Sequence, residues 1–576
     1  MNKLKKLFNT NIFFLLLLIT IIFLLYGKSI NYNLLFLDDF DSLKVKSNFM
    51  SDIKNLPKIF VMDVYMEKEE QSYYYRPVLA LSFAIETLFF GENSKVNHIT
   101  NLILFILSVY LMYVFLTELK FNKNIVKFIL LLVAVSPLLT SNAVYVSPRA
   151  ESFLAIFSIL TLLYIKKYFD NGKIKNLFFA ELFFLLSLWS KESAIVLIAV
   201  IPLFLYAIDK FSIKKILKLY VWLIFPVTVY FVFRKISGSN SKILLVEYVE
   251  NFVFILKNMF NGYIAYINKI LIPENVPVCL YNYSADLTSI LKAGIFVLCL
   301  IVFYYKKFIN GKYILFGILL FVLYLLPTFL ILQNQIFFHR LLLPVLGFII
   351  IFVLLVQKII ELFPISKKYL LILWIILFTV FFYGAFLQAD KYKTNASFAL
   401  NGYKDAPEYF VFISGLSTTY LFALDYNKDS LSLIKEQDYK KLSELAIGLY
   451  QCKKFSNAEE IFKKLIELNK YIPFCYANLS LIYKDKQDYP KALEYAQKAV
   501  LASPTNINFK ENLARIYYLN GKYQQAIDIY KQLLKNATRN AQYYYGIASV
   551  YYKSGDKQTA AEYINKAVDI DFENSK

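Results

Sequence analysis

Residues 1–27 read MNKLKKLFNTNIFFLLLLITIIFLLYG, a basic flank followed by an unbroken apolar run from Ile12 to Tyr26. A run of this kind approaches the roughly 20 residues that an α-helix needs to cross about 30 Å of hydrocarbon. No small-residue cleavage site follows it. The segment is therefore predicted to be an uncleaved membrane anchor and not a signal peptide.

The rest of the chain shares this apolar character. Of 576 residues, 58% are hydrophobic and only 18% are charged, which excludes a string of soluble domains. The formal net charge of +21 is the excess expected of a membrane protein, so we expect no nucleic-acid partner. The four cysteines form no CxxC pair and only two histidines accompany them, which argues against a zinc or dithiol site.

Ten further apolar segments bring the predicted number of membrane spans to eleven. They lie near 99–118, 125–146, 151–166, 176–190, 192–208, 217–234, 290–305, 313–332, 341–357 and 369–388. The segment 251–272 between two of them is predicted to be an amphipathic helix at the membrane surface. The first 389 residues are thus expected to form an all-α membrane bundle.

The lysines predict the orientation of the bundle, because basic loops remain in the cytoplasm. They gather in every second connection, at 3–6, 120–127, 166–175, 210–218, 306–312 and 358–368. The N-terminus is therefore predicted to be cytoplasmic. Eleven crossings then put the polar region after residue 389 outside, together with the loops 28–98 and 235–289.

The C-terminal region repeats with a period of 34 residues. Small residues recur at Ala458, Ala492, Ala526 and Ala560, and the best unit, 473–504, reads PFCYANLSLIYKDKQDYPKALEYAQKAVLASP. This period, with small residues where two helices cross, resembles the tetratricopeptide repeat. We expect a linker or degenerate repeat at 390–438 and an α-solenoid at 439–576. Its concave surface would bind a protein partner or acceptor, or else serve only as a scaffold.

A group of carboxylates opens the first predicted outside loop. Asp38, Asp39 and Asp41 lie in NYNLLFLDDFDSLKVKSNF, about a dozen residues after the first span. Adjacent carboxylates can provide a general base, or hold a substrate or divalent cation. A solvated acidic turn is the alternative. An acidic pair at this place resembles the GT-C glycosyltransferases, which use lipid-phosphate sugars.

Four other segments sharpen the resemblance. They contain Tyr75, Arg76 and Pro77 with His98 and Asn101; Arg149 and Glu151; Ser190, Lys191 and Glu192; and His339, Arg340 and Pro344. With the repeats, they make the chain similar over its length to the transmembrane and TPR-repeat-containing (TMTC-type) protein O-mannosyltransferases. All these sites lie in loops that the lysine pattern places outside.

The resemblance implies an inverting transfer of a sugar from a polyprenyl or dolichyl monophosphate to a hydroxyl. It implies that Asp38 is the base and Asp39 its partner, with Asp41 a weaker candidate. Arg340 is expected to bind the phosphate, because guanidinium binds phosphate oxygens in pairs. His339, Lys191 and Arg76 would add positive charge.

Less direct roles are expected for four other residues of these segments. Arg149 would pair with Glu151, Glu192 would orient Lys191, and His98 would make a hydrogen bond at a helix entry. Simpler alternatives are interfacial anchors for Arg340 and Lys191. No cofactor is firmly implied, although Asp38 and Asp39 would accept a divalent cation.

The short repeat array and the bias toward Lys, Asn, Ile, Phe and Tyr depart from the animal family. They favour a bacterial plasma membrane over the endoplasmic reticulum. The carrier would then be undecaprenyl phosphate, and mannose or another hexose would be transferred. Three functions are possible on this basis. The protein transfers the sugar to Ser/Thr of exported proteins held by the repeats, or it modifies a surface polysaccharide or lipid, or it is a non-catalytic scaffold.

Overall fold

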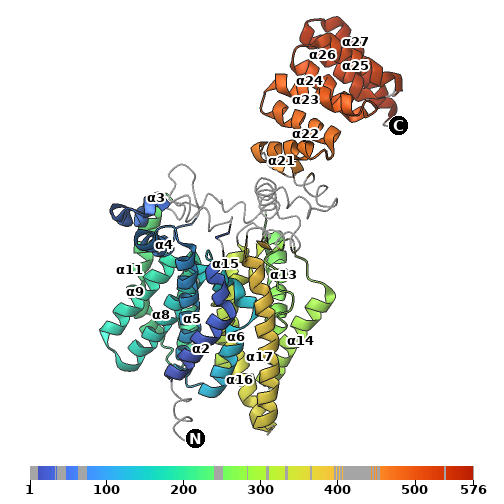
Figure 1. The fold of residues 1–576 in the computed structure, drawn as a ribbon. Coiled ribbons are helices and arrows are strands. Elements are labelled where there is room, and N and C mark those ends of the chain that lie inside the picture. Colours follow the sequence, from blue (N-terminus) through green and yellow to red (C-terminus); the bar gives the residue numbers. More distant parts are fainter. Residues whose placement is uncertain are drawn as a thin grey trace. The chain divides into compact units, whose positions relative to one another are not determined.

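The computed structural model describes 11–32, 34–35, 47–62, 74–238, 251–281, 283–305, 310–330, 335–363, 366–394, 397–398, 401, 405, parts of 443–450, 455–536 and 540–574. The chain divides into two compact units, Met1–Glu408 and Tyr409–Lys576. Each is described by itself. Figure 1 shows the first as a helix bundle and the second as stacked helix pairs.

The first unit is built from long helices joined by short connections. Its α-helices are α2 (Asn11–Tyr26), α3 (Ser47–Met50), α4 (Pro77–Phe90), α5 (Ser94–Glu118), α6 (Lys123–Ala134), α7 (Thr140–Val144), α8 (Arg149–Asn171), α9 (Ile174–Ser190), α10 (Leu197–Ala207), α11 (Ile213–Ile236), α13 (Phe252–Leu271), α14 (Leu287–Tyr305), α15 (Gly311–Phe329), α16 (Val345–Leu362) and α17 (Lys367–Ala389). Its 3₁₀ helices are η1 (Gly27–Asn31), η3 (Ile53–Val61), η4 (Pro137–Leu139), η5 (Glu192–Val196), η6 (Phe338–Leu341) and η7 (Asp390–Tyr392). The described part also contains one antiparallel strand pair, β1 (Leu280–Tyr281) with β2 (Gln335–Ile336).

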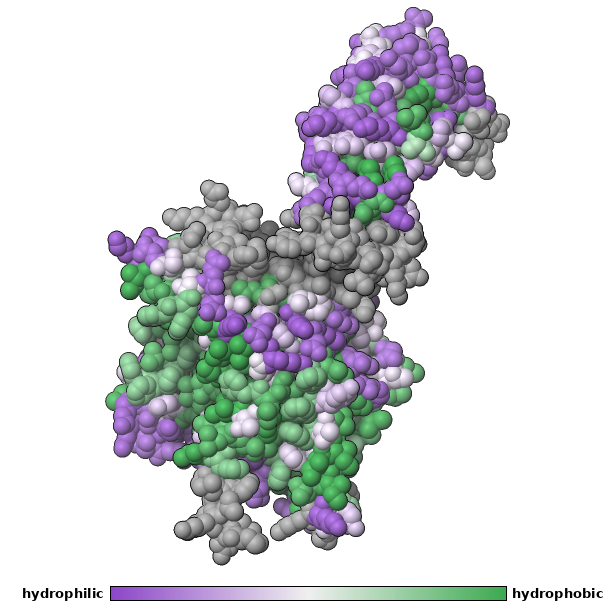
Figure 2. All heavy atoms as spheres, in the orientation of Figure 1, coloured by the Kyte–Doolittle hydropathy of each residue, from purple (hydrophilic) through white to green (hydrophobic). Residues whose placement is uncertain are grey.

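The sequence predicts eleven spans, but fewer helices meet the length and hydrophobicity that a membrane-spanning helix needs. Eight helices are long and apolar enough to cross a membrane within the described ranges, and a bent pair would make nine. The bent pair is the predicted span 125–146, which turns by 58° between Ala134 and Pro137. Proline lacks a backbone N–H and clashes with the preceding turn, so a helix cannot continue straight through it. Figure 2 shows apolar residues around the middle of the bundle and polar residues toward both ends.

The two other predicted spans that fall short are α9 and η5 with α10. Ion pairs show how far they run along α8. Lys191, which follows α9, pairs with Glu151 in the first turn of α8. Lys210, just after α10, has its Nζ 3.5 Å from Oδ1 of Asp170 near the other end of α8. Both segments therefore cover the same height as α8, although each is shorter than a typical spanning helix.

The first and last long helices of the bundle run in the same direction. Lys28 follows α2, and its Nζ lies 3.0 Å from Oδ1 of Asp390 and 2.9 Å from the carbonyl oxygen of Phe386 at the end of α17. The two helices therefore end at the same end of the bundle, side by side. The predicted number of spans and their orientation stay predictions.

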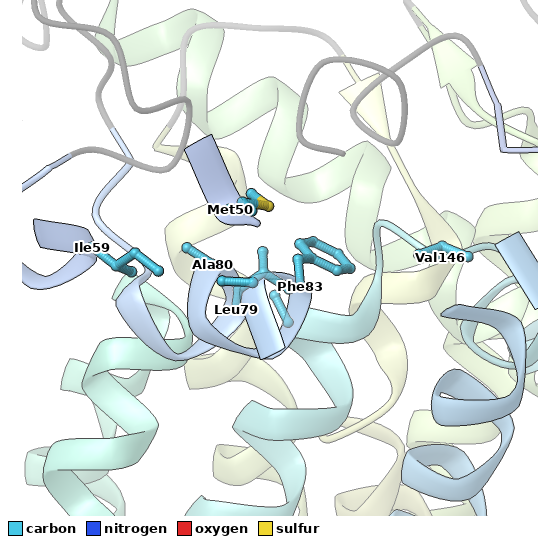
Figure 3. Close-up of a cluster of buried hydrophobic side chains, with 8 residues drawn as sticks. Met50, Ile59, Leu79, Ala80, Phe83 and Val146 are labelled. Carbon is cyan, nitrogen blue, oxygen red and sulfur yellow. The ribbon is translucent and has the colours of Figure 1, made fainter. Parts of the chain in front are cut away.

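One end of the bundle carries a small hydrophobic cluster. Figure 3 shows its side chains, which come from α3, η3, α4, the turn before α8 and the first turn of α8: Met50, Ile59, Leu79, Ala80, Phe83, Ala84, Val146 and Ala150. Leu34, on the chain that leaves α2, packs against the same cluster. The described residues on both sides of the acidic segment, Leu34 and Met50, therefore lie at this end.

The helices α15 and α16 cross with almost no space between their backbones. A Cβ atom added at Gly347 would lie 2.2 Å from the carbonyl oxygen of Gly317, and one at Gly317 would lie 2.6 Å from that of Gly347. Real Cβ atoms do not approach a backbone oxygen so closely. Glycine at both positions allows this contact, which fixes the helix that follows the His339–Arg340 turn.

Replacement of Gly347 by alanine should therefore destabilise the bundle by about 1–3 kcal/mol, because the two backbones must move apart. Thermal unfolding of the purified protein in detergent measures this loss. Gly294→Ala on α14 is the matched control, since nothing lies within 4 Å of its added Cβ. Equal unfolding temperatures for the two variants would show that the crossing tolerates separation.

The second unit contains paired helices with the predicted 34-residue period. They are α21 (Phe455–Glu467), α22 (Ile472–Asp485), α23 (Tyr489–Ala502), α24 (Ile507–Leu519), α25 (Tyr523–Asn536), α26 (Ala541–Ser554) and α27 (Lys557–Asn574). The four predicted small residues, Ala458, Ala492, Ala526 and Ala560, are all buried. The predicted repeat core is thus confirmed.

The turns between paired helices follow the same period. Gly521 after α24 and Gly555 after α26 have φ angles of +71° and +96°. The equivalent position after α22 is Gln487, at φ +61°. Since side chains disfavour the left-handed region by about 1–2 kcal/mol, Gln487 is a strained version of the same turn.

We expect Gln487→Gly to stabilise the repeat region by up to about 1 kcal/mol and Gly521→Gln to destabilise it by a similar amount. Thermal unfolding of the full chain, followed by a probe on the repeat region, gives both values. A stabilising effect of Gly521→Gln would contradict this account of the turn.

Candidate functional site

The predicted site residues that the structure describes gather at one end of the bundle. They come from α4 and α5, the start of α8, the α9–η5 junction and η6. The predicted base Asp38, its partner Asp39 and Asp41 lie outside the described residues. The predicted catalytic role of this pair stays a prediction.

Arg149 is the most buried charged residue of the group, with no exposed surface. Its Nη1 donates to Oε1 of Glu86 at 3.0 Å and to Oγ of Ser82 at 3.2 Å, and its Nη2 donates to the carbonyl oxygen of Asn97 at 2.9 Å. Its Nε lies 3.4 Å from Oδ1 of Asn101. The guanidinium is thus held by hydrogen bonds to residues of two helices, α4 and α5.

Glu86 completes this buried network. It also accepts a hydrogen bond from Nδ2 of Asn97, and its side chain is only 9% exposed. The Phe83 ring covers Arg149, with the guanidinium carbon 4.4 Å from the ring centroid. Arg149 and Glu86 therefore join α8 to α4 by a buried ion pair.

The pairings predicted from the sequence are wrong. Arg149 pairs with Glu86 and not with Glu151, whereas Glu151 pairs with Lys191. Glu192 does not orient Lys191 but binds Arg76. Arg149 and Glu151 diverge because residues two positions apart on a helix point about 200° apart. Lys191 and Glu192 diverge because Lys191 is extended, whereas Glu192 begins η5.

Glu192 holds the segment that leads into α4. Its carboxylate accepts from the Arg76 Nη2 at 3.0 Å, from the Arg76 Nε at 3.1 Å and from the backbone N–H of Tyr75 at 3.1 Å. The Tyr75 hydroxyl donates to the carbonyl oxygen of Phe60 in η3 at 2.7 Å. About a fifth of the Arg76 side chain is exposed. Arg76 therefore retains one accessible side while its position is fixed.

Lys191 faces Glu151 at the start of α8. Its removal from water lowers the pKa of Lys191, and the positive charges of Arg340 and Arg76 lower it further, whereas Glu151 raises it. Glu151 itself is favoured in the first helical turn, where backbone N–H groups are unsatisfied. The cations of three separate loops thus interact with one another at this end.

His339 and Arg340 lie on η6, which Asn142 anchors to α7. Nδ2 of Asn142 donates to the carbonyl oxygen of His339 at 2.9 Å. Burial, together with the charges of Arg340, Lys191 and Arg76, holds the pKa of His339 well below its usual value. This shift disfavours the charged imidazolium, and the predicted contribution of His339 to the positive charge stays a prediction.

Arg340 differs from the other cations in its partners. Arg149, Lys191 and Arg76 each pair with a glutamate, namely Glu86, Glu151 and Glu192. No carboxylate of the described residues lies within ion-pair distance of Arg340, whose guanidinium carbon lies 5.3 Å from the Phe337 ring centroid. The described site therefore carries one uncompensated positive charge.

His98 lies beside this network and is 1% exposed. Its ring meets Tyr32 edge-on at 6.4 Å, and neither ring nitrogen has a hydrogen-bond partner of good geometry within the described part of the chain. His98 does lie at the entry of α5, as predicted.

The sequence analysis missed Glu86, Asn97 and Asn142 as site residues. Glu86 gave a usable signal, since it is the one carboxylate within the apolar segment 77–90, and such residues tend to mark function or pairing. Asn142 gave none, because its role depends on a contact with a residue 197 positions away. Over the described ranges, no three His, Cys, Asp or Glu side chains are arranged to bind a metal ion.

Comparison with known proteins identifies only the C-terminal region. The tetratricopeptide repeat family model matches residues 478–538 and 511–573. No protein of curated function matches the chain significantly.

The chain is similar to solved structures of MamA. One is 18% identical and covers 29% of this chain and 92% of its own, with a TM-score of 0.25. Another, MamA 41-end from Desulfovibrio magneticus RS-1, is 14% identical over 32% of this chain and 98% of its own, with a TM-score of 0.26. The family match is what shows tetratricopeptide repeats in the C-terminal region, over residues 478–573.

Arg149→Met should destabilise the bundle by about 3–5 kcal/mol, because it leaves the Glu86 carboxylate buried without its counter-charge. Lys166→Met on the same helix is the control, since Lys166 pairs with Asp170 near the surface and should contribute no more than about 1 kcal/mol. Thermal unfolding in detergent compares the two. A loss for Arg149→Met no larger than the control would contradict the role of this buried pair, and Glu86→Gln added to Arg149→Met should restore part of the stability.

Proposed function

We propose that this protein is an integral-membrane glycosyltransferase that moves a sugar from a polyprenyl monophosphate to a hydroxyl. The observation that carries the proposal is that no carboxylate of the described residues lies within ion-pair distance of Arg340, beside three cations that each pair with a glutamate. A buried or half-buried cation without a counter-ion is costly, so it favours an anionic ligand. A lipid phosphate brings such an anion to the membrane surface.

The chemistry needs stabilisation of the leaving phosphate. As the bond between the sugar C1 and the phosphate oxygen breaks, negative charge develops on that oxygen. Fixed cations stabilise this charge most where water is largely excluded. We assign Arg340 to the phosphate. Arg340 and Arg76 both act electrostatically on Lys191, so Lys191 and Arg76 add positive potential near Arg340.

The attacking hydroxyl needs a base on the opposite side of the sugar. By resemblance to the GT-C family, Asp38 takes the hydroxyl proton while the hydroxyl oxygen bonds to C1, and Asp39 assists. The sugar is transferred with inversion, and the lipid phosphate leaves. Leu34 and Met50, which flank the acidic segment, pack against the cluster that covers Arg149, which supports a location of the base at this end.

The topology belongs to the same proposal. Counting α9, η5 with α10 and the bent pair α6–α7 as crossings gives eleven spans. The lysine pattern then puts the site and the repeats on the outer side of a plasma membrane, with the N-terminus in the cytoplasm. The repeats would hold an exported protein whose Ser or Thr hydroxyl is the acceptor.

The test uses membranes that contain wild type, Asp38→Asn, Arg340→Ala or the control Arg515→Ala. Arg515 pairs with Glu511 on an exposed helix face of the repeats. Radiolabelled undecaprenyl-phosphate sugars are supplied, and label is followed into protein, lipid and polysaccharide. We expect label in protein with wild type and Arg515→Ala, and a loss of at least about 100-fold with Asp38→Asn and Arg340→Ala.

Other outcomes discriminate between the alternatives. Label in polysaccharide or lipid would keep the transferase and replace the acceptor. No transfer from any donor by a correctly folded wild-type protein would refute the enzyme and favour a membrane scaffold. Equal activity of Arg340→Ala and wild type would refute the assignment of the phosphate.

A further inference from the structure

The loop that carries Arg340 is held mainly through its backbone. β2 pairs with β1, with Ile336 opposite Leu280. The next residue, Phe337, accepts a hydrogen bond at its carbonyl oxygen from the Tyr266 hydroxyl at 3.1 Å. Together with the bond from Asn142 to His339, these contacts fix the chain on the N-terminal side of Arg340. The position of Arg340 therefore depends on the position of β1.

The strand β1 is in turn held from the segment that follows the last membrane helix. We name the described residues 390–394, 397–398, 401 and 405 the exit segment. Oδ2 of Asp405 accepts from the backbone N–H of Val278 at 2.7 Å, and Nζ of Lys391 donates to the carbonyl oxygen of Val276 at 2.7 Å. Lys391 Nζ also lies 3.9 Å from Oδ2 of Asp405. The two side chains thus bind two backbone groups of the segment that leads into β1, the N–H of Val278 and the carbonyl oxygen of Val276.

The other end of the exit segment is tied to the chain that leads to the acidic pair. Oδ1 of Asp390 accepts from the Tyr32 hydroxyl at 3.1 Å and from Lys28 Nζ at 3.0 Å. Between these ties, Tyr392 and Phe398 pack on Tyr145, with ring centroids 5.9 Å and 5.5 Å away. The exit segment therefore contacts both sides of the candidate site.

We propose that Asp405 and Lys391 are positioning residues that set the place of Arg340 through β1 and β2. The exit segment precedes the repeats in the chain, and its hydrogen bonds to the residues before β1 connect it to the loop that carries Arg340. The phosphate-binding role of Arg340 in this inference rests on the proposed function, whereas the anchoring of β1 by Asp405 and Lys391 does not. One measurement tests the anchoring of β1, and a second tests its effect on Arg340.

The first measurement follows the thiol of Cys279, which precedes β1 and has no exposed surface. Cys299, Cys452 and Cys475 are replaced by alanine, and the alkylation rate of Cys279 by a small maleimide is recorded in detergent. Asp405→Ala should raise the rate by about tenfold or more, because β1 loses its anchor. Asp405→Asn should not, since its amide oxygen still accepts from Val278.

The matched control is Asp286→Ala. Asp286 lies in the same connection but caps α14, accepting from the backbone N–H of Ser289 at 3.0 Å. Its loss should leave the alkylation rate unchanged. An unchanged rate in Asp405→Ala, or an equal rise in both alanine variants, would overturn the hold of the exit segment on β1.

The second measurement is binding of radiolabelled, sugar-free undecaprenyl monophosphate in detergent. Asp405→Ala should weaken binding about tenfold in the wild-type background and add nothing in Arg340→Ala, because it acts through Arg340. Equal weakening in both backgrounds would overturn the route through Arg340. Absence of binding by the wild type would count against the proposed donor, while the alkylation rates would still decide whether the exit segment holds β1.

Discussion

The buried charge of Arg149 constrains the whole end of the bundle where the candidate site lies. A guanidinium without exposed surface must have its donors satisfied, because an unpaired charge away from water is strongly unfavourable. Glu86, Ser82, Asn97 and Asn101 supply the acceptors, and they belong to two helices. The directions of α4, α5 and α8 relative to one another follow from this requirement. Asn101 and Asn142 then extend the hydrogen-bonded structure to η6.

The buried pair of Arg149 and Glu86 leaves the outer cations as the charges that can act on a ligand. Because Arg149 and Glu86 balance each other inside, the charges that can influence a ligand are those of Arg76, Lys191 and Arg340. Two of these are paired with glutamates that also fix their loops. Positioned cations of this kind pay little reorganisation when a phosphate leaves, which is the property expected of a preorganised site. Of these three cations, Arg340 has no carboxylate partner among the described residues.

The repeat region follows a different physical logic. A single helix pair cannot bury its apolar face by itself. Each pair therefore buries its small and aromatic residues against the next pair. Stability is therefore local and additive, and a strained turn such as Gln487 affects mainly its neighbours. In the bundle, by contrast, contacts such as Gly317 with Gly347 or Lys28 with Asp390 join segments far apart in the chain. The two units are expected to respond separately to mutation.

The sequence by itself determined the class of the protein and most of its elements. Apolar length, lysine distribution and the 34-residue period are properties of local sequence, so they predicted the helices, their alternation and the repeats. Pro137 shows a limit of this approach, because hydropathy alone treats a bent pair as one span. Asp38 and Asp39 were likewise singled out by position in the chain alone.

Only the tertiary structure decided which polar residues meet. Sequence neighbours such as Arg149 and Glu151, or Lys191 and Glu192, appeared to be natural pairs, yet each finds its partner on another element. Successive side chains on a helix point about 100° apart, so Arg149 and Glu151, two positions apart, point about 200° apart, and the partner of each depends on which helix packs there. The carboxylate partners of Arg149 and Lys191, and the hydrogen bond to Asp405 from the backbone N–H of Val278 before β1, join residues 40 or more positions apart. Such contacts leave no pattern in a single sequence because only folding brings them together.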